Sequence, residues 1–106
     1  MFVIVWRYVV RPELVDDFLA AYGPDGLWAE LFNRSPEFVG VELFVDDVSG
    51  GFVTIDRWQH EAAWREFMSA HRSDYDDLDV RLERLTVSEL LVARGSAVGR
   101  PAGGAG

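Results

Sequence analysis

The 106-residue sequence contains no cysteine, which excludes disulfides, a thiolate nucleophile and any cysteine-ligated metal site. Positive charge is also scarce: 10 Lys and Arg residues stand against 18 Asp and Glu, a formal net charge of −8. The chain therefore lacks the basic face that binding to nucleic acid or to anionic membranes requires. The apolar start, residues 1–10, is interrupted by Arg7 and is too short to span a bilayer. We expect a cytoplasmic protein that binds neither nucleic acid nor membrane.

Apolar and aromatic residues are abundant. Hydrophobic residues make up 49% of the chain and aromatic residues 13%, which favours one small folded domain over a disordered chain. Residues 95–106 are rich in glycine and alanine and have no apolar period. We therefore expect a folded domain over residues 1–94 and a flexible tail over 95–106.

The spacing of apolar residues predicts the order of the elements. Val-, Ile- and aromatic-rich runs predict strands at residues 2–10, 37–47, 52–58 and 86–94. Helical spacing follows Pro12 as far as Tyr22, resumes after Gly23–Pro24, and returns at His60 for about six turns. The order β-α-β-β-α-β predicts an α+β, ferredoxin-like fold, in which both helices cover one face of a four-stranded antiparallel sheet.

The predicted strands are apolar on both sides. In the first strand, one side is expected to carry Phe2, Ile4, Trp6, Tyr8 and Val10, and the other Val3, Val5 and Val9. In the second strand, strict alternation places Phe38 and Phe44 opposite Val39, Val41, Leu43 and Val45. Helices of one chain can cover only one face. Leaving the other wet would cost many kcal/mol at about 25 cal/mol per Å². We therefore expect a homodimer that packs sheet against sheet.

Three stretches resemble the antibiotic biosynthesis monooxygenase domain of the dimeric α+β barrel superfamily. They are "PELVDDFLAAY" (12–22), the tryptophan that closes "TIDRW" (54–58), and "EAAWREFMSAHRSDYDDLD" (61–79). The resemblance covers about residues 2–94. It implies that two ferredoxin-like protomers close a barrel, each with a hydrophobic cavity between sheet and helices. It further implies a cofactor-independent monooxygenase, in which an acidic phenol or anthrone loses a proton and its carbanion reduces O2 without metal or flavin.

The last predicted helix carries the candidate catalytic residues. Trp64, Phe67, His71 and Tyr75 follow one another at helical spacing. We assign the catalytic role to His71, Tyr75 and Trp64, with the His71 imidazole as general base or substrate anchor. Plainer interpretations stand beside these: Trp64 as core packing, His71 as a hydrogen-bonded histidine of the core or rim, and Tyr75 with its hydroxyl in water.

Further residues are expected to bind an aromatic substrate: Trp28, Phe32, Asn33, Arg7, Trp58 and Phe67. Trp58 also fits an anchor at a strand end, and Arg7 fits an ion pair with a nearby acid. Asn33 fits the end of a helix. Asp56 shares a strand face with Trp58 and adds a carboxyl group to the candidate cavity.

Two alternative functions remain open on the same fold. One is a non-catalytic small-molecule-binding or accessory dimer, and the other is a haem-degrading oxygenase with His71 as axial ligand. No metal site is expected, because His60 and His71 lie eleven positions apart without a clear carboxylate group. An enclosed pocket with His71, Tyr75 or an arginine facing in would favour the oxygenase, whereas a filled core would favour the accessory role.

Overall fold

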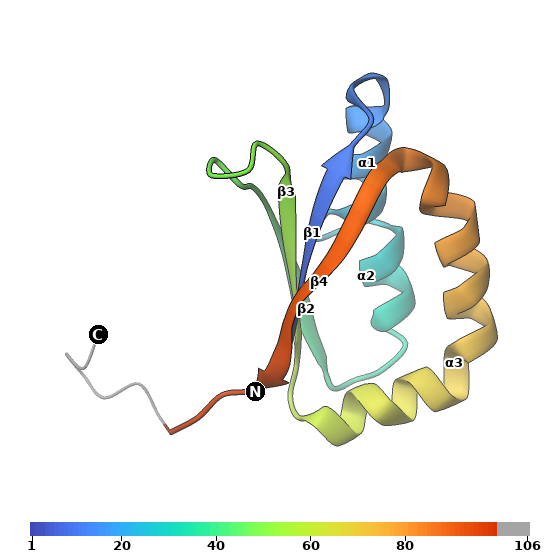
Figure 1. Ribbon diagram of the computed structural model, residues 1–106. Helices are drawn as coiled ribbons and strands as arrows, with labels where there is room; N and C mark the ends of the chain where they lie inside the picture. Colours follow the sequence, from blue (N-terminus) through green and yellow to red (C-terminus); the bar gives the residue numbers. More distant parts are fainter. Residues whose placement is uncertain (100–106) are drawn as a thin grey trace.

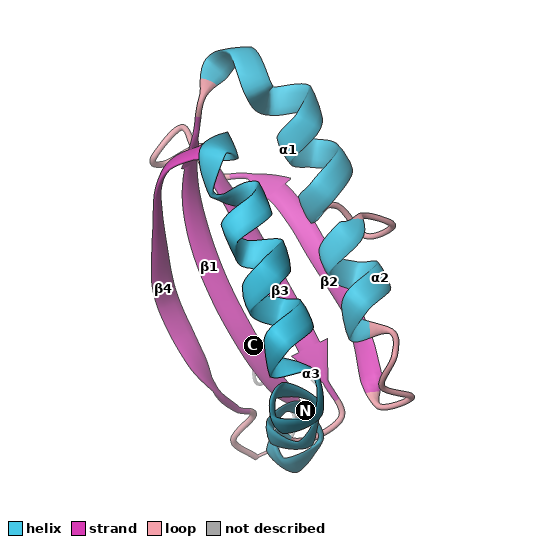
Figure 2. Ribbon diagram, turned by 90° about the vertical axis from the view of Figure 1, so that its right-hand side faces the viewer, coloured by secondary structure: helices cyan, strands magenta, loops and turns pink. Residues whose placement is uncertain are grey.

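The computed structural model describes residues 1–99 and has the predicted α+β architecture. Its elements in chain order are β1 (Phe2–Val10), η1 (Pro12–Leu14), α1 (Val15–Tyr22), α2 (Leu27–Phe32), β2 (Phe38–Val45), β3 (Phe52–Trp58), α3 (Glu61–Leu82), η2 (Glu83–Leu85) and β4 (Thr86–Ser96). The strands form one antiparallel sheet in the order β2-β3-β1-β4. All helices lie on one side of the sheet (Figures 1 and 2). The ferredoxin-like prediction is confirmed.

Local chemistry explains where the helices begin and end. Pro12 occupies the first turn of η1, where its missing N–H costs nothing. At Gly23, α1 has ended, and a Cβ atom there would lie 2.8 Å from the Leu19 carbonyl oxygen. The His60 imidazole Nδ1 accepts a hydrogen bond of 3.2 Å from the Ala63 N–H, which caps α3. These signals hold the helices at fixed positions along the sheet.

The sheet has two unlike sides, which we name the helix face and the open face. Across the strands, the helix face carries the rows Phe38–Trp58–Phe2 and Val41–Asp56–Ile4. Trp58, Phe18 and Leu85 are the largest fully buried side chains on the helix side of the sheet. Because these rows pack against the helices, the core and any cavity lie on this side.

A bulge in β2 changes one predicted side-chain direction. The register with β3 shifts between Phe38 and Gly40, so Val39 has no partner in the ladder. Phe38 therefore turns to the helix face, where its ring lies 5.0 Å from the ring of Trp58, and Val39 is exposed. The prediction that Phe38 lies on the face opposite Val41 was wrong, because strict alternation does not pass through a bulge.

The open face is largely apolar, as the sequence predicted, but it also carries Arg7 and the Arg57–Glu42 ion pair. One row across all four strands is Phe44–Val53–Arg7–Leu90, and Phe44 is 44% and Leu90 57% exposed. The structure contains one chain, so the sheet-to-sheet dimer stays a prediction.

The first residues after position 94 belong to β4. β4 continues to Ser96, and the Ala97 N–H donates to the Met1 carbonyl oxygen at 3.0 Å. The tail predicted for 95–106 thus starts inside a strand, and its residues 100–106 lie outside the described part. No helix within residues 1–99 is long and apolar enough to cross a membrane.

Candidate functional site

A cavity of about 90 Å³ lies between the helix face of the sheet and the helices. Aromatic rings form most of its wall: Trp6, Tyr8, Tyr22, Trp28, Phe32 and Tyr75. The remaining lining residues are Val41 and Thr54 together with three acids, Asp56, Asp79 and Glu89. All four strands and all three α-helices contribute, because each presents its core-facing side chains to the same space.

Asp56 is the most perturbed acid of the cavity. It lies in the middle of β3, and its neighbours across the ladders are the buried apolar residues Ile4 and Val41. No hydrogen bond or ion pair reaches its carboxyl group from the described residues. Burial without a partner disfavours the charged form and raises the pKa of Asp56 from 3.8 to about 7. Asp56 can therefore exchange a proton near neutral pH.

The three tyrosines of the cavity are hydrogen-bond donors. The Thr54 hydroxyl donates to the Tyr8 hydroxyl oxygen at 3.4 Å. Burial raises the pKa of Tyr8 far above its usual range, and raises the pKa of Tyr22 and of Tyr75 to about 12. All three hydroxyls stay protonated at neutral pH, so they can donate hydrogen bonds to an oxygen of a bound molecule.

Trp28 brings a second group without a partner. Its side chain is 8% exposed, and its indole Nε1 is buried with no hydrogen bond of good geometry, although it lies near the Tyr22 hydroxyl. Its ring centroid lies 4.9 Å from that of Tyr75 and 5.7 Å from that of Phe32. A ligand oxygen at this place would give the Trp28 N–H an acceptor of better geometry.

Two further acids complete the lining. Glu89 is exposed, whereas Asp79 and Asp56 are half-buried. Protein atoms surround the Asp56 carboxyl most completely, which places Asp79 and Glu89 nearer the mouth. Burial and, next, the Asp79 carboxylate raise the pKa of Glu89. Burial and, next, Asp76 raise the pKa of Asp79. None of the lining residues is Lys, Arg or His. Within residues 1–99, no three His, Cys, Asp or Glu side chains come close enough to hold a metal ion.

Three of the nine predicted site residues meet in this cavity. Trp28 and Phe32 from α2 and Tyr75 from α3 line it together. They were identified from helical spacing, which the structure preserves. Tyr75 is the only predicted catalytic residue among them.

Four predicted residues of β3 and α3 lie elsewhere. Trp58, fully buried, packs against Phe38 and Phe67, which places both Trp58 and Phe67 in the core. Trp64 lies against Phe2, 5.4 Å between ring centroids, under the Arg94 guanidinium. The ring of His71 lies 4.8 Å from that of Phe67, half-buried and outside the cavity lining.

The backbone at His71 accounts for its direction. His71 has non-helical angles, φ −122° and ψ 23°, and α3 bends there (Figure 1). Residues before the bend pack over the Trp58 end of the sheet, whereas Tyr75 and Asp79 beyond it reach the cavity. An ideal helical stripe does not include this change of direction.

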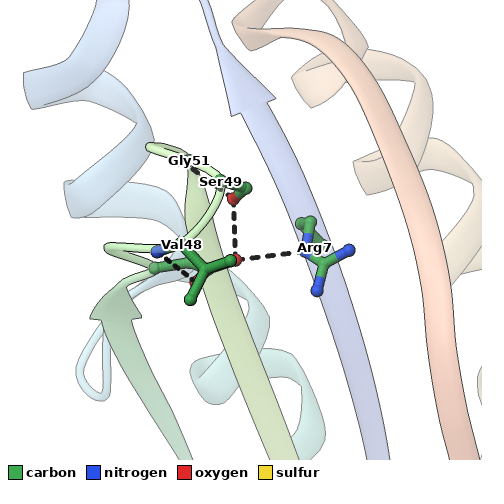
Figure 3. Close-up of polar contacts among 5 residues, drawn as sticks. Arg7, Val48, Ser49 and Gly51 are labelled. Atoms are coloured by element: carbon green, nitrogen blue, oxygen red, sulfur yellow. Dashed lines mark hydrogen bonds and ion pairs between the residues drawn. The ribbon is translucent and has the colours of Figure 1, made fainter.

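Arg7 and Asn33 do not reach the cavity either. Arg7 lies between Trp6 and Tyr8 and points to the open face, where its Nε is 3.2 Å from an Asp46 carboxylate oxygen. Figure 3 shows Arg7 beside the turn that joins β2 and β3. Asn33 is exposed and caps the C-terminus of α2. Arg7 lies outside this cavity because successive strand residues face opposite sides, and its substrate-binding role stays a prediction.

Sequence reasoning gave too little weight to the strand residues of the cavity. Tyr8, Thr54 and Asp56 all line it, and only Asp56 was noticed. The signal was present: Thr54 and Asp56 alternate with apolar residues on the same strand face as Trp58. A polar pair on a face that otherwise enters the core indicates either an internal hydrogen-bond network or a site.

Solved structures of similar fold support the resemblance. No protein-family model matches the sequence, and no curated protein matches it. A structure described as an antibiotic biosynthesis monooxygenase is 23% identical, with a TM-score of 0.61, and the match covers 93% of this chain and all of that one. A variant of SnoaB, a cofactor-independent oxygenase from Streptomyces nogalater, is 20% identical with a TM-score of 0.62, over 95% of this chain and 94% of that one.

A third similar structure binds a porphyrin. A variant of MhuD with two manganese protoporphyrin IX molecules per active site is 16% identical, with a TM-score of 0.64, over 96% of this chain and 99% of that one. At these identities the likeness is one of fold. The resemblance to antibiotic biosynthesis monooxygenases is thus confirmed as a shared fold over nearly the whole chain.

Proposed function

We propose that this protein is a cofactor-independent monooxygenase that oxidises an aromatic or polyketide-like small molecule with O2. The observation that carries the proposal is Asp56: a carboxyl group without a partner in an aromatic cavity, with a pKa of about 7. Oxygenation without a metal or flavin needs a base that turns the substrate into an electron-rich anion. Oxygenases of the same fold add support.

The chemistry can be written with this chain's own residues. Asp56 accepts a proton from an acidic ring carbon or hydroxyl of the substrate. The hydroxyls of Tyr22 and Tyr75 and the Trp28 N–H donate hydrogen bonds to the oxyanion that forms. The anion passes an electron to O2, and the two radicals combine to a peroxide anion. This anion takes the proton back from Asp56, which gives a hydroperoxide and restores the Asp56 carboxylate. Loss of water then leaves a new carbonyl group, so one oxygen atom enters the product and the other leaves as water.

The size of the cavity limits what enters. A volume of about 90 Å³ is below the roughly 300–1,000 Å³ of ordinary ligand pockets. The cavity therefore takes the reacting end of a substrate, and the rest lies in the mouth near Asp79 and Glu89. Such a cavity does not suit a whole haem, and His71 lies outside its lining, so we do not favour a haem-degrading role.

The small volume does favour a second candidate, a non-catalytic small-molecule-binding or accessory dimer. Neither His71 nor an arginine faces the cavity, and only Tyr75 of the groups expected for an oxygenase does. In both functions we propose that two copies pack through their open faces. The exposed apolar side chains of Phe44 and Leu90 support this pairing.

Oxygen uptake with an anthrone substrate tests the proposal. We expect Asp56→Asn to lower turnover at least about 100-fold, the usual contribution of a general base. The control Glu66→Gln removes one negative charge from an exposed position of α3 outside the cavity, and should leave turnover unchanged. His71→Ala should have little effect. Turnover that survives Asp56→Asn and fails with His71→Ala would refute the assignment, and no turnover in any form of the protein would favour the accessory role.

A further inference from the structure

The electrostatics of the cavity indicate the charge of its ligand. Asp56, Asp79 and Glu89 line it, no basic side chain does, and the chain as a whole is strongly acidic. An anionic ligand would meet three carboxyl groups without a compensating cation. A carboxylate or phosphate is therefore the least suitable ligand for this space.

The two acids at the mouth lie close enough to affect each other. The Asp79 carboxylate contributes to the raised pKa of Glu89, so the two repel. Both carboxylates also act on Tyr22 and Tyr75, whose rings line the same space. A cation between the two carboxylates would relieve their repulsion and lie against aromatic rings.

Aromatic walls select the kind of cation. A metal ion needs several oxygen ligands at short distance, and within residues 1–99 no three acids converge in that way. An organic ammonium group is larger and poorly hydrated, and it binds to the faces of tryptophan and tyrosine rings. Trp6, Trp28 and the three tyrosines supply such faces on several sides.

We propose that the mouth of this cavity, between Asp79 and Glu89, binds the ammonium group of a small organic amine. The inference deepens the proposed function and rests on it for the identity of the site. The substrate is then a phenol that carries an aliphatic or quaternary ammonium group, held by this cationic end at Asp79 and Glu89. Asp56, deeper in the cavity, stays free to take the acidic proton.

The volume agrees with this class of ligand. An engineered cavity of about 150 Å³ holds benzene, so about 90 Å³ suits part of one ring, with the ammonium group outside it in the mouth. The buried Trp28 N–H, which lies near the Tyr22 hydroxyl without a hydrogen bond of good geometry, fits a hydroxyl or carbonyl oxygen on the same molecule.

Three probes of nearly equal shape but different charge test whether binding at the mouth depends on the charge of the ligand. Choline carries a trimethylammonium group, 3,3-dimethyl-1-butanol replaces it with a neutral tert-butyl group, and 3,3-dimethylbutyrate is an anion. Binding is measured by calorimetry and by the indole N–H resonance of Trp28, assigned with Trp28→Phe. We expect choline to bind at least about tenfold more tightly than the alcohol, the size of one desolvated cation–π contact, and the anion not to bind.

Variants locate the site. The double change Asp79→Asn and Glu89→Gln should weaken choline binding at least about tenfold and leave binding of the alcohol unchanged. The control Glu66→Gln should affect neither probe. Choline should also bind more tightly as pH rises through about 7, because the Asp56 carboxyl in the same cavity ionises there, while Tyr8, Tyr22 and Tyr75 stay neutral.

The outcomes distinguish this inference from the proposed function. Four results would each overturn the amine-binding inference. They are equal binding of choline and the alcohol, preference for the anion, no binding of any probe, and choline binding that the double change does not weaken. These results do not depend on oxygen uptake. Conversely, the protein could bind choline and show no oxygen uptake with any phenolic amine. That result would support the amine-binding site and refute the proposed monooxygenase function.

Discussion

Replacing Asp56 with asparagine should change how the stability of the fold depends on pH. Asparagine has nearly the same shape and cannot ionise, so the variant removes one charge from the cavity with little change in packing. The Asp56 carboxyl has a pKa of about 7 in the folded protein and an ordinary value of 3.8 without burial. The two states therefore bind different numbers of protons between those values.

The direction of this pH dependence follows from which state, folded or unfolded, holds the Asp56 proton. Between pH 3.8 and about 7 the folded protein keeps the Asp56 proton and the unfolded chain has released it. The free energy of unfolding contributed by Asp56 therefore falls as pH rises through this window and is constant above it. One pKa unit corresponds to about 1.4 kcal/mol. Raising the pH from 3.8 to above 7 therefore lowers the wild-type free energy of unfolding by about 4 kcal/mol through Asp56.

The assay is urea denaturation at a series of pH values and at one fixed protomer concentration, which a dimer requires. We expect wild type and Asp56→Asn to be nearly equal near pH 4, and the variant to be more stable by up to about 4 kcal/mol near pH 8. Comparing the two proteins cancels the other titrating groups. A difference that does not change with pH would show that Asp56 is hydrated in the folded state, and would remove the basis for its role as a base.

Three other predictions concern the scaffold. Trp58→Ala should lower the free energy of unfolding in urea by about 3–5 kcal/mol, because the ring is fully buried, whereas Trp64→Ala should cost clearly less. Gly51→Ala should cost about 1–3 kcal/mol in the same assay, because the new Cβ would lie 2.4 Å from the Tyr8 carbonyl oxygen. Leu90→Asp should convert a dimer at micromolar concentration to monomers in sedimentation velocity, and a wild-type monomer would contradict the dimer.

The fold could be predicted because each element has a strong periodic signal of its own. Val- and aromatic-rich runs alternate with helical spacing, and Gly23, Pro36 and the Asp46–Gly51 turn separate them. The bulge at Val39 could not be predicted in the same way. Its one extra residue depends on how β2 pairs with β3, and pairing is not a property of either strand alone.

Among the residues that line the cavity, those on helices were predicted better than those on strands. Trp28, Phe32 and Tyr75 were found because large aromatic residues on a helical stripe indicate a core-facing side. His71 follows the same spacing, but the helix bends at that residue. The spacing of residues along one helix does not contain such a bend.

The strongest argument for a functional Asp56 comes from its position in the sheet. Its neighbours across the ladders are Ile4 and Val41, and a third apolar residue there would complete a buried row. A carboxyl group without a partner at this position destabilises the charged folded state and is, within residues 1–99, part of no ion pair. Structural roles for buried acids depend on such pairs. This position therefore supports our proposal that a ligand supplies the hydrogen-bond donor that the Asp56 carboxyl lacks.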